Sequence, residues 1–75
     1  MTKQEMQLQV LEIVRNQTDK EVDPATPFKD YDIDSLDTTV ILYDIEQAFN
    51  VEIEPDEEES LQTVDDIVAH LQAKM

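Results

Sequence analysis

The sequence predicts an all-α fold, a four-helix bundle of three longer helices and one short helix, with a long loop between the first and second helices. Apolar residues recur at the spacing of an amphipathic helix in three separate segments. Residues that favour helix N-termini precede these segments. Apolar and polar residues alternate only over residues 51–54, which is short for a strand. At 75 residues, the chain 1–75 has the size of a single domain.

The first helix is expected from Thr2 to about Asn16. Thr2 and Glu5 have the spacing of a capping box, in which each side chain accepts a hydrogen bond from the other residue's backbone N–H. Apolar residues then recur along the segment: Met6, Val10, Ile13 and Val14.

A long connection follows, in which Pro24 and Pro27 interrupt regular structure. Phe28 is apolar in an otherwise polar stretch, so we expect it to anchor this loop to the core.

The second helix is expected from about Ser35 to Phe49, with Asp34 and Ser35 as cap residues. It has two apolar faces. The broader one, expected to face the core, comprises Thr38, Ile41, Leu42, Ile45 and Phe49. The opposite face carries Leu36, Val40 and Tyr43. One bundle cannot bury both faces, so the second row either packs under the long loop or forms a docking strip for partners.

The C-terminal part contains the remaining two predicted helices. Pro55 at a first-turn position, followed by four acidic residues, predicts a short third helix whose dipole the carboxylates complement. The last helix is expected to begin at Thr63–Val64. Its apolar stripe comprises Val64, Ile67, Val68 and Leu71.

The charge of the chain restricts its partners. Nineteen acidic and five basic residues give a net charge of −14, and no Lys or Arg lies between Asp30 and Ala73. Such a surface repels nucleic acids and anionic lipids and attracts basic protein surfaces. We therefore expect protein partners and no nucleic acid.

Composition also bears on location and chemistry. No apolar run approaches the roughly 20 residues of a membrane span, and the first residues lack the apolar core of a signal peptide. We expect no stable membrane insertion, a cytoplasmic location and a monomer. The chain has no cysteine, so any sulfur chemistry requires a prosthetic group.

The sequence offers no coherent catalytic constellation. His70 is the only histidine, and we expect it on the surface of the last helix. One serine and one distant histidine do not make a catalytic triad. Ser35 is therefore not interpreted as a catalytic nucleophile, and the protein is not expected to be an enzyme.

A calcium loop is the competing interpretation of the same region. Asp30, Asp32 and Asp34 match the first ligand positions of an EF-hand loop. Ser35 then occupies the position that needs glycine, and Ile41 occupies the position that needs a bidentate glutamate. We therefore expect no specific metal site.

The segment from Asp30 to Thr38 resembles the phosphopantetheine attachment site of acyl carrier proteins, an Asp-Ser-Leu that typically follows Leu-Gly. The resemblance extends over nearly the whole chain, including the loop 24–28 and the end of the second helix at 45–49. Two positions depart from the family pattern. Tyr31–Asp32 replaces Leu-Gly, and Asp tolerates a left-handed turn better than most residues. Val40 replaces a frequent glutamate, which suggests a specialised partner with a more apolar docking site.

The resemblance implies a carrier whose Ser35 bears 4'-phosphopantetheine and presents acyl chains as thioesters to biosynthetic enzymes, in fatty acid or specialised lipid synthesis. Its partners would be a phosphopantetheinyl transferase and acyl-chain synthesis and transfer enzymes. The implied docking residues are Asp34, Leu36, Asp37, Val40, Tyr43, Asp44 and Glu46. The implied acyl-chain pocket is bordered by Leu42, Ile53 and Leu61. A polyketide or D-alanyl carrier, and an acidic interaction module without a prosthetic group, remain alternatives.

Overall fold

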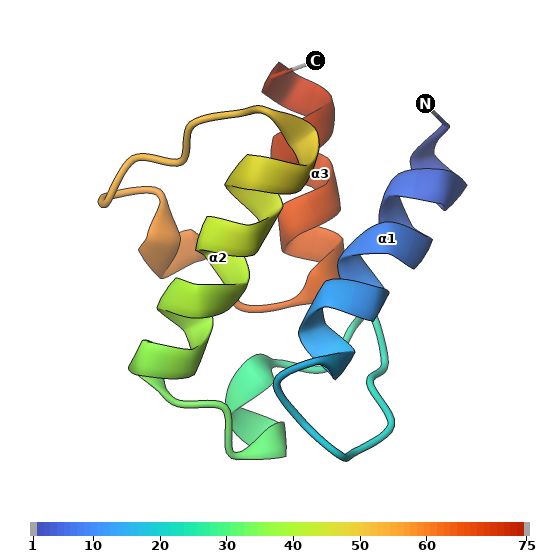
Figure 1. Cartoon of the computed structure of the whole chain (residues 1–75), viewed down its shortest axis with the longest axis vertical. Helices are drawn as coiled ribbons and strands as arrows, with labels where there is room; N and C mark the ends of the chain where they lie inside the picture. Colours follow the sequence, from blue (N-terminus) through green and yellow to red (C-terminus); the bar gives the residue numbers. More distant parts are fainter. Residues whose placement is uncertain (1, 75) are drawn as a thin grey trace.

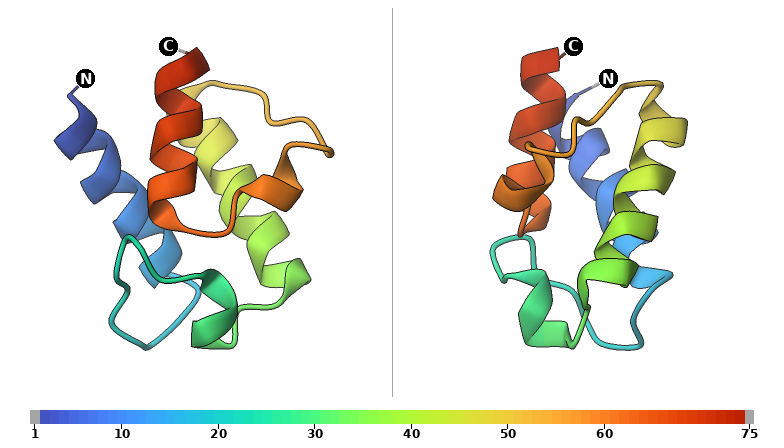
Figure 2. Two further views of the ribbon diagram at one scale, coloured as in Figure 1. Left: turned by 180° about the vertical axis from the view of Figure 1, so that it is seen from behind. Right: turned by 90° about the vertical axis from the view of Figure 1, so that its left-hand side faces the viewer.

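The computed structural model describes residues 2–74 and contains three α-helices, α1 (Lys3–Arg15), α2 (Ser35–Phe49) and α3 (Val64–Lys74). Two 3-10 turns, Phe28–Tyr31 and Glu58–Ser60, lie in the connections, and residues 2–74 contain no strand. The helices lie side by side, with α1 packed against α2 and α3. As Figures 1 and 2 show, α1 runs in one direction along the molecule, and α2 and α3 both run back in the other. The all-α prediction is confirmed.

The expected short third helix is not found. The segment after Pro55 forms a turn and then the 3-10 turn Glu58–Ser60, whose end is closed by a hydrogen bond from the Leu61 N–H to the Glu58 carbonyl at 3.1 Å. The direction of the helices explains the difference. Because α2 and α3 are roughly parallel, this connection must return along the length of α2 (Figure 1). Extended chain advances about 3.3 Å per residue and an α-helix about 1.5 Å, so a further helix would shorten the reach.

Side chains that close the first turn define where the helices begin. At α1, the Glu5 N–H donates to the Thr2 hydroxyl at 3.2 Å and the Thr2 N–H donates to the Glu5 carboxylate at 3.1 Å. The hydrogen bonds that the Thr2 N–H and the Thr2 hydroxyl donate to the Glu5 carboxylate lower the pKa of that carboxyl. At α2, the Asp34 carboxylate accepts from the Asp37 N–H at 2.9 Å. The predicted capping box and the predicted cap at Asp34 are both confirmed.

The core is built from most residues of the apolar stripes that the sequence indicates, whereas Ile13 and Thr38 of those stripes are only half-buried. Phe28 is also buried, as predicted, and so is Tyr31. No polar or charged side chain is buried among residues 2–74. The helical core residues are Met6, Val10, Leu11 and Val14 of α1, Ile41, Leu42, Ile45 and Phe49 of α2, and Val64, Ile67, Val68 and Leu71 of α3. Burying one such side chain contributes roughly 1.5–3 kcal/mol, which must offset the entropy of ordering a short chain.

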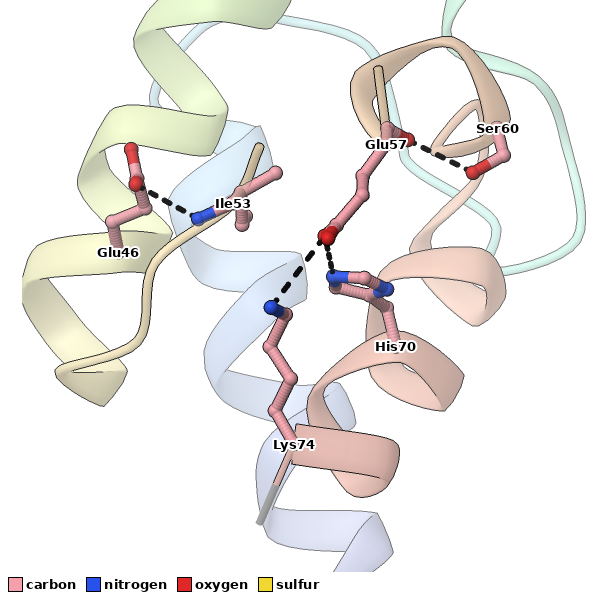
Figure 3. Close-up of polar contacts among 6 residues, drawn as sticks. All are labelled: Glu46, Ile53, Glu57, Ser60, His70 and Lys74. Atoms are coloured by element: carbon pink, nitrogen blue, oxygen red, sulfur yellow. Dashed lines mark hydrogen bonds and ion pairs between the residues drawn. The ribbon is translucent and has the colours of Figure 1, made fainter. Parts of the chain in front are cut away.

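The connection between α2 and α3 is anchored by two carboxylates (Figure 3). Glu46 on α2 accepts a hydrogen bond from the Ile53 N–H at 3.0 Å. Further along, the Glu57 carboxylate lies 2.5 Å from the His70 imidazole and 3.6 Å from the Lys74 ammonium, both on α3. His70 was expected on the surface, but its side chain is only 21% exposed. Its position depends on Glu57, which is distant in sequence.

Among residues 2–74, two residues adopt the left-handed conformation, Asp32 (φ 60°) and Asn50 (φ 54°). The chain contains no glycine, so its sharpest turns depend on the residue types that tolerate this region best. Asn50 ends α2 and donates its N–H to the Glu46 carbonyl.

Replacing Asn50 tests this constraint. Asn50→Ala should lower the free energy of unfolding by about 1 kcal/mol, because alanine adopts a positive φ only with steric strain. Asn50→Gly should retain the native stability within about 0.5 kcal/mol, because glycine has no such strain. Urea unfolding followed by circular dichroism measures both. An alanine variant as stable as the native chain would contradict the argument.

Candidate functional site

The candidate site centres on Ser35, the first residue of α2, which is exposed. The backbone N–H groups of Ser35 and Leu36 have no acceptor among residues 2–74, as is usual in the first turn of a helix. These N–H groups and the helix dipole favour an anion beside the serine hydroxyl. The local arrangement therefore suits the attachment of a negatively charged group.

A short, well-anchored segment leads into Ser35. The 3-10 turn Phe28–Tyr31 is followed by Asp32 in the left-handed conformation, and the Ile33 N–H donates back to the Phe28 carbonyl at 3.3 Å. Tyr31 is buried, and its hydroxyl accepts a hydrogen bond from the Asp23 N–H at 2.6 Å. Asp32 adopts the conformation that the sequence predicts for this position, so the turn forms without glycine.

Lys20 forms an ion pair with this turn. Its ammonium lies 2.8 Å from the Asp32 carboxylate. The hydrogen bond from Lys20 and its charge lower the pKa of the Asp32 carboxyl. The pair joins the beginning of the long loop to its end, directly before the candidate site.

A cavity of about 310 Å³ lies beside Ser35. One wall is the start of α2, and the others come from the 28–31 turn and from the segment before α3. The Phe28 N–H donates to the Gln62 carbonyl at 2.8 Å and so joins these two walls. The lining residues are Pro27, Phe28, Lys29, Ile33, Asp34, Ser35, Thr38, Leu61 and Gln62.

The three residues expected to border an acyl-chain pocket are all buried in the same core cluster, but they differ in whether they reach the cavity. Leu61 lines the cavity beside Ser35. Leu42 and Ile53 do not line it and are buried in the core, 1% and 7% exposed. Sequence reasoning missed Lys29 and Gln62 on the cavity wall. Lys29 could have been found as the last basic residue before the long acidic stretch, whereas nothing in the sequence indicates Gln62.

The second apolar row of α2 lies in solvent. Leu36, Val40 and Tyr43 are 75%, 44% and 59% exposed, so the long loop does not cover them. Among the predicted acidic neighbours, Asp34 is exposed, and Asp37, Asp44 and Glu46 are half-buried. Glu46 differs from the others because its carboxylate also holds the Ile53 N–H. It therefore has a structural role that the sequence did not suggest.

The histidine does not line the cavity beside Ser35. His70 is paired with Glu57 of the connection that precedes α3 (Figure 3). Within residues 2–74 no three His, Asp or Glu side chains are grouped so that they could hold a metal ion. No helix in the same residues is both long and apolar enough to span a membrane.

Comparisons with known proteins agree with this geometry. Residues 8–71 match the family model described as "Phosphopantetheine attachment site". An acyl carrier protein of Streptococcus pyogenes serotype M1 is 41% identical over 68 residues, which cover 87% of this chain and 89% of that protein. The acyl carrier proteins of an Exiguobacterium species and of Syntrophobacter fumaroxidans are 34% and 39% identical. The former alignment covers both chains fully, and the latter covers 88% of this chain and 86% of its relative.

The Lys20–Asp32 pair can be tested by titration. In Lys20→Gln the pKa of Asp32 should rise toward the ordinary value of about 3.9, because the hydrogen bond and the positive charge that favour the carboxylate are lost. Since the folded-state pKa is lowered, the pair stabilises the native chain above the unfolded pKa. That contribution is lost as the pH falls through the folded pKa.

The measurement is the NMR titration of the Asp32 side-chain carboxyl carbon. Lys3→Gln removes the same charge from the start of α1 and should leave the Asp32 titration unchanged. An identical Asp32 pKa in the native chain and Lys20→Gln would refute the assignment.

Proposed function

The chain belongs to the acyl carrier protein family, and on this basis we propose that it carries acyl chains on a prosthetic arm attached to Ser35. The prosthetic group of this family is 4'-phosphopantetheine. The observation that carries the proposal is the exposed Ser35 hydroxyl at the start of α2, within the residues that match the family.

The residues around Ser35 fit such a group. A phosphate on this hydroxyl would lie beside the free N–H groups of the first turn. Asp34 brings an opposing negative charge, but its carboxylate accepts the Asp37 N–H and has a defined role as the cap of α2. The cavity beside Ser35 offers room for part of the arm.

Attachment requires an enzyme that this chain does not contain. A phosphopantetheinyl transferase would form a bond between the Ser35 oxygen and the phosphorus next to the pantetheine of coenzyme A. The bond from that phosphorus to the adenosine 3',5'-bisphosphate leaving group breaks, and the hydroxyl proton passes to a base of the transferase. The role of this chain is to present the hydroxyl on a fixed helix end. The thiol of the attached arm supplies the thioester chemistry that the cysteine-free chain lacks.

We propose that an acyl chain on the arm is sheltered between the helices. The opening would be the cavity wall at Leu61, with Leu42 and Ile53 behind it in the aliphatic core. Such a chain would bury apolar area and therefore stabilise the fold by linkage. Leu42 and Ile53 are both packed in the core, so the acyl chain can enter only if the core opens locally.

The exposed row of α2 is proposed as the docking strip for the transferase and for the enzymes that load and use the arm. Leu36, Val40 and Tyr43 supply apolar contacts, and Asp34, Asp37 and Asp44 border them. Since no Lys or Arg lies between Asp30 and Ala73, the partners should present basic residues around an apolar patch. Glu46 completes the predicted set, with its carboxylate shared between docking and the Ile53 N–H.

The pathway proposed is fatty acid or specialised lipid synthesis. Apolar Val40 in the docking strip favours a dedicated set of partners over a general one. Polyketide and D-alanyl carriers would have the same arm and differ in cargo. The intact mass of the protein purified from its own host distinguishes these cargoes.

Ser35→Ala tests the attachment. Incubation of the native chain with coenzyme A, Mg²⁺ and a broad-specificity phosphopantetheinyl transferase should add one phosphopantetheine, measured by intact mass. Ser35→Ala should show no gain because it lacks the hydroxyl, while its circular dichroism spectrum stays native. Absence of a mass gain in the native chain with several transferases would overturn the proposal in favour of an interaction module.

Tyr43→Asp tests the docking strip, with Leu8→Asp as the matched control. The two residues are 59% and 60% exposed, and each change adds one negative charge, but Leu8 lies on α1. Tyr43→Asp should raise the KM of the transferase for the protein about tenfold or more, because a docking contact becomes a charge. Leu8→Asp should change KM little. Equal KM values for the two variants would count against the strip, and unfolding by Tyr43→Asp would assign this side chain to the core.

A further inference from the structure

We infer that Lys29 is the counter-ion of the phosphate attached to Ser35 and positions the arm in the adjoining cavity. This inference rests on the proposed function, because it concerns the group that Ser35 would carry. It assigns a role to a residue outside the serine motif and outside the docking strip. Its basis is the shared cavity, the anchoring of the turn and the distribution of basic residues.

Lys29 and Ser35 line the same cavity of about 310 Å³. Lys29 lies in the 3-10 turn Phe28–Tyr31, and hydrogen bonds at both ends of this turn fix its backbone. At one end the Phe28 N–H donates to the Gln62 carbonyl at 2.8 Å. At the other, the Ile33 N–H donates to the Phe28 carbonyl at 3.3 Å. The turn therefore holds Lys29 at the cavity wall, while its flexible stem leaves the ammonium free to adjust.

Among residues 2–74, Lys29 is the only basic residue that lines this cavity. Lys20 is paired with Asp32 at 2.8 Å and, together with Arg15, lines a different cavity. Within residues 2–74, the Lys29 ammonium has no carboxylate within ion-pair distance. After Lys29, the next Lys or Arg in the sequence is Lys74. Lys29 is thus the one positive charge at the Ser35 cavity that is not already neutralised.

A phosphodiester at Ser35 needs such a charge. It keeps one negative charge at all physiological pH values and would stand beside Asp34 in a chain of net charge −14. Repulsion between these groups opposes attachment and destabilises the loaded fold. Lys29, Asp34 and Ser35 are all exposed, so the attraction of the ammonium for the phosphate is screened by salt and reduces the repulsion most at low ionic strength. The free N–H groups of the first turn act in the same direction.

The experiment compares the unloaded and loaded forms of three chains: the native chain, Lys29→Gln, and Lys3→Gln as the control. Lys3→Gln removes an equal charge from the start of α1, which lies at the opposite end of the molecule from the start of α2 (Figure 1). Thermal melting is measured for each form at low salt and in 1 M NaCl. The phosphorus NMR signal of each loaded form is recorded as a second readout.

At low salt, loading should lower Tm by about 2–4 °C more in Lys29→Gln than in the native chain or in Lys3→Gln. This additional decrease in the Tm of Lys29→Gln should disappear in 1 M NaCl, where the Debye length is about 3 Å. The phosphorus signal should shift in Lys29→Gln alone. Equal effects of loading on Tm in all three chains, with an unshifted phosphorus signal, would overturn the role of Lys29 and leave attachment at Ser35 intact. A native chain that gains no mass on loading would overturn both proposals.

Discussion

One geometric constraint governs this protein: a helix with apolar residues on opposite faces can bury only one of them in a bundle of three helices. In α2 the buried face holds Ile41, Leu42 and Ile45, all at most 1% exposed. This packing fixes the rotation of α2 about its axis. Leu36, Val40 and Tyr43 are left in solvent as a direct consequence. The same rotation exposes Ser35 at the end of the helix, so core packing, the exposed strip and the candidate site are not independent features.

Four carboxylates of this acidic chain stabilise the fold through hydrogen bonds to backbone N–H groups or through ion pairs. Glu5 and Asp34 satisfy N–H groups at the starts of α1 and α2. Glu46 on α2 accepts the Ile53 N–H and so holds the connection between α2 and α3 to α2. Glu57, within that connection, pairs with His70 and so holds it to α3. An acidic surface costs stability through self-repulsion, and these hydrogen bonds, together with the ion pairs of Glu57, recover part of that cost. The remaining carboxylates give the surface its attraction for basic partners.

The site depends on two long-range hydrogen bonds that the loop after α1 makes with residues at and just before the start of α3. The Phe28 N–H binds the Gln62 carbonyl at 2.8 Å, and the Asp65 N–H binds the Pro24 carbonyl at 3.0 Å. Together they attach the loop that follows α1 to the chain that leads into α3. The cavity beside Ser35 exists because these two segments, distant in sequence, are held against the start of α2. Lys29 reaches the cavity through the same attachment.

The sequence by itself determined the helical class, the beginnings of α1, α2 and α3, the core stripes and the serine at the head of α2. Each of these depends on neighbours within a few residues: capping at Thr2 and Asp34, periodicity within a helix, and a left-handed turn at Asp32. The prosthetic group was identified from the resemblance of this sequence to a known family.

Tertiary structure alone decided that the segment after Pro55 is not an α-helix. Because α2 and α3 run parallel, the chain between them has to return along the length of α2. Tertiary structure alone also brought His70 to Glu57 and placed Lys29 and Leu61, but not Leu42 or Ile53, on the cavity wall. These features join residues far apart in the chain, and no local propensity encodes such distances.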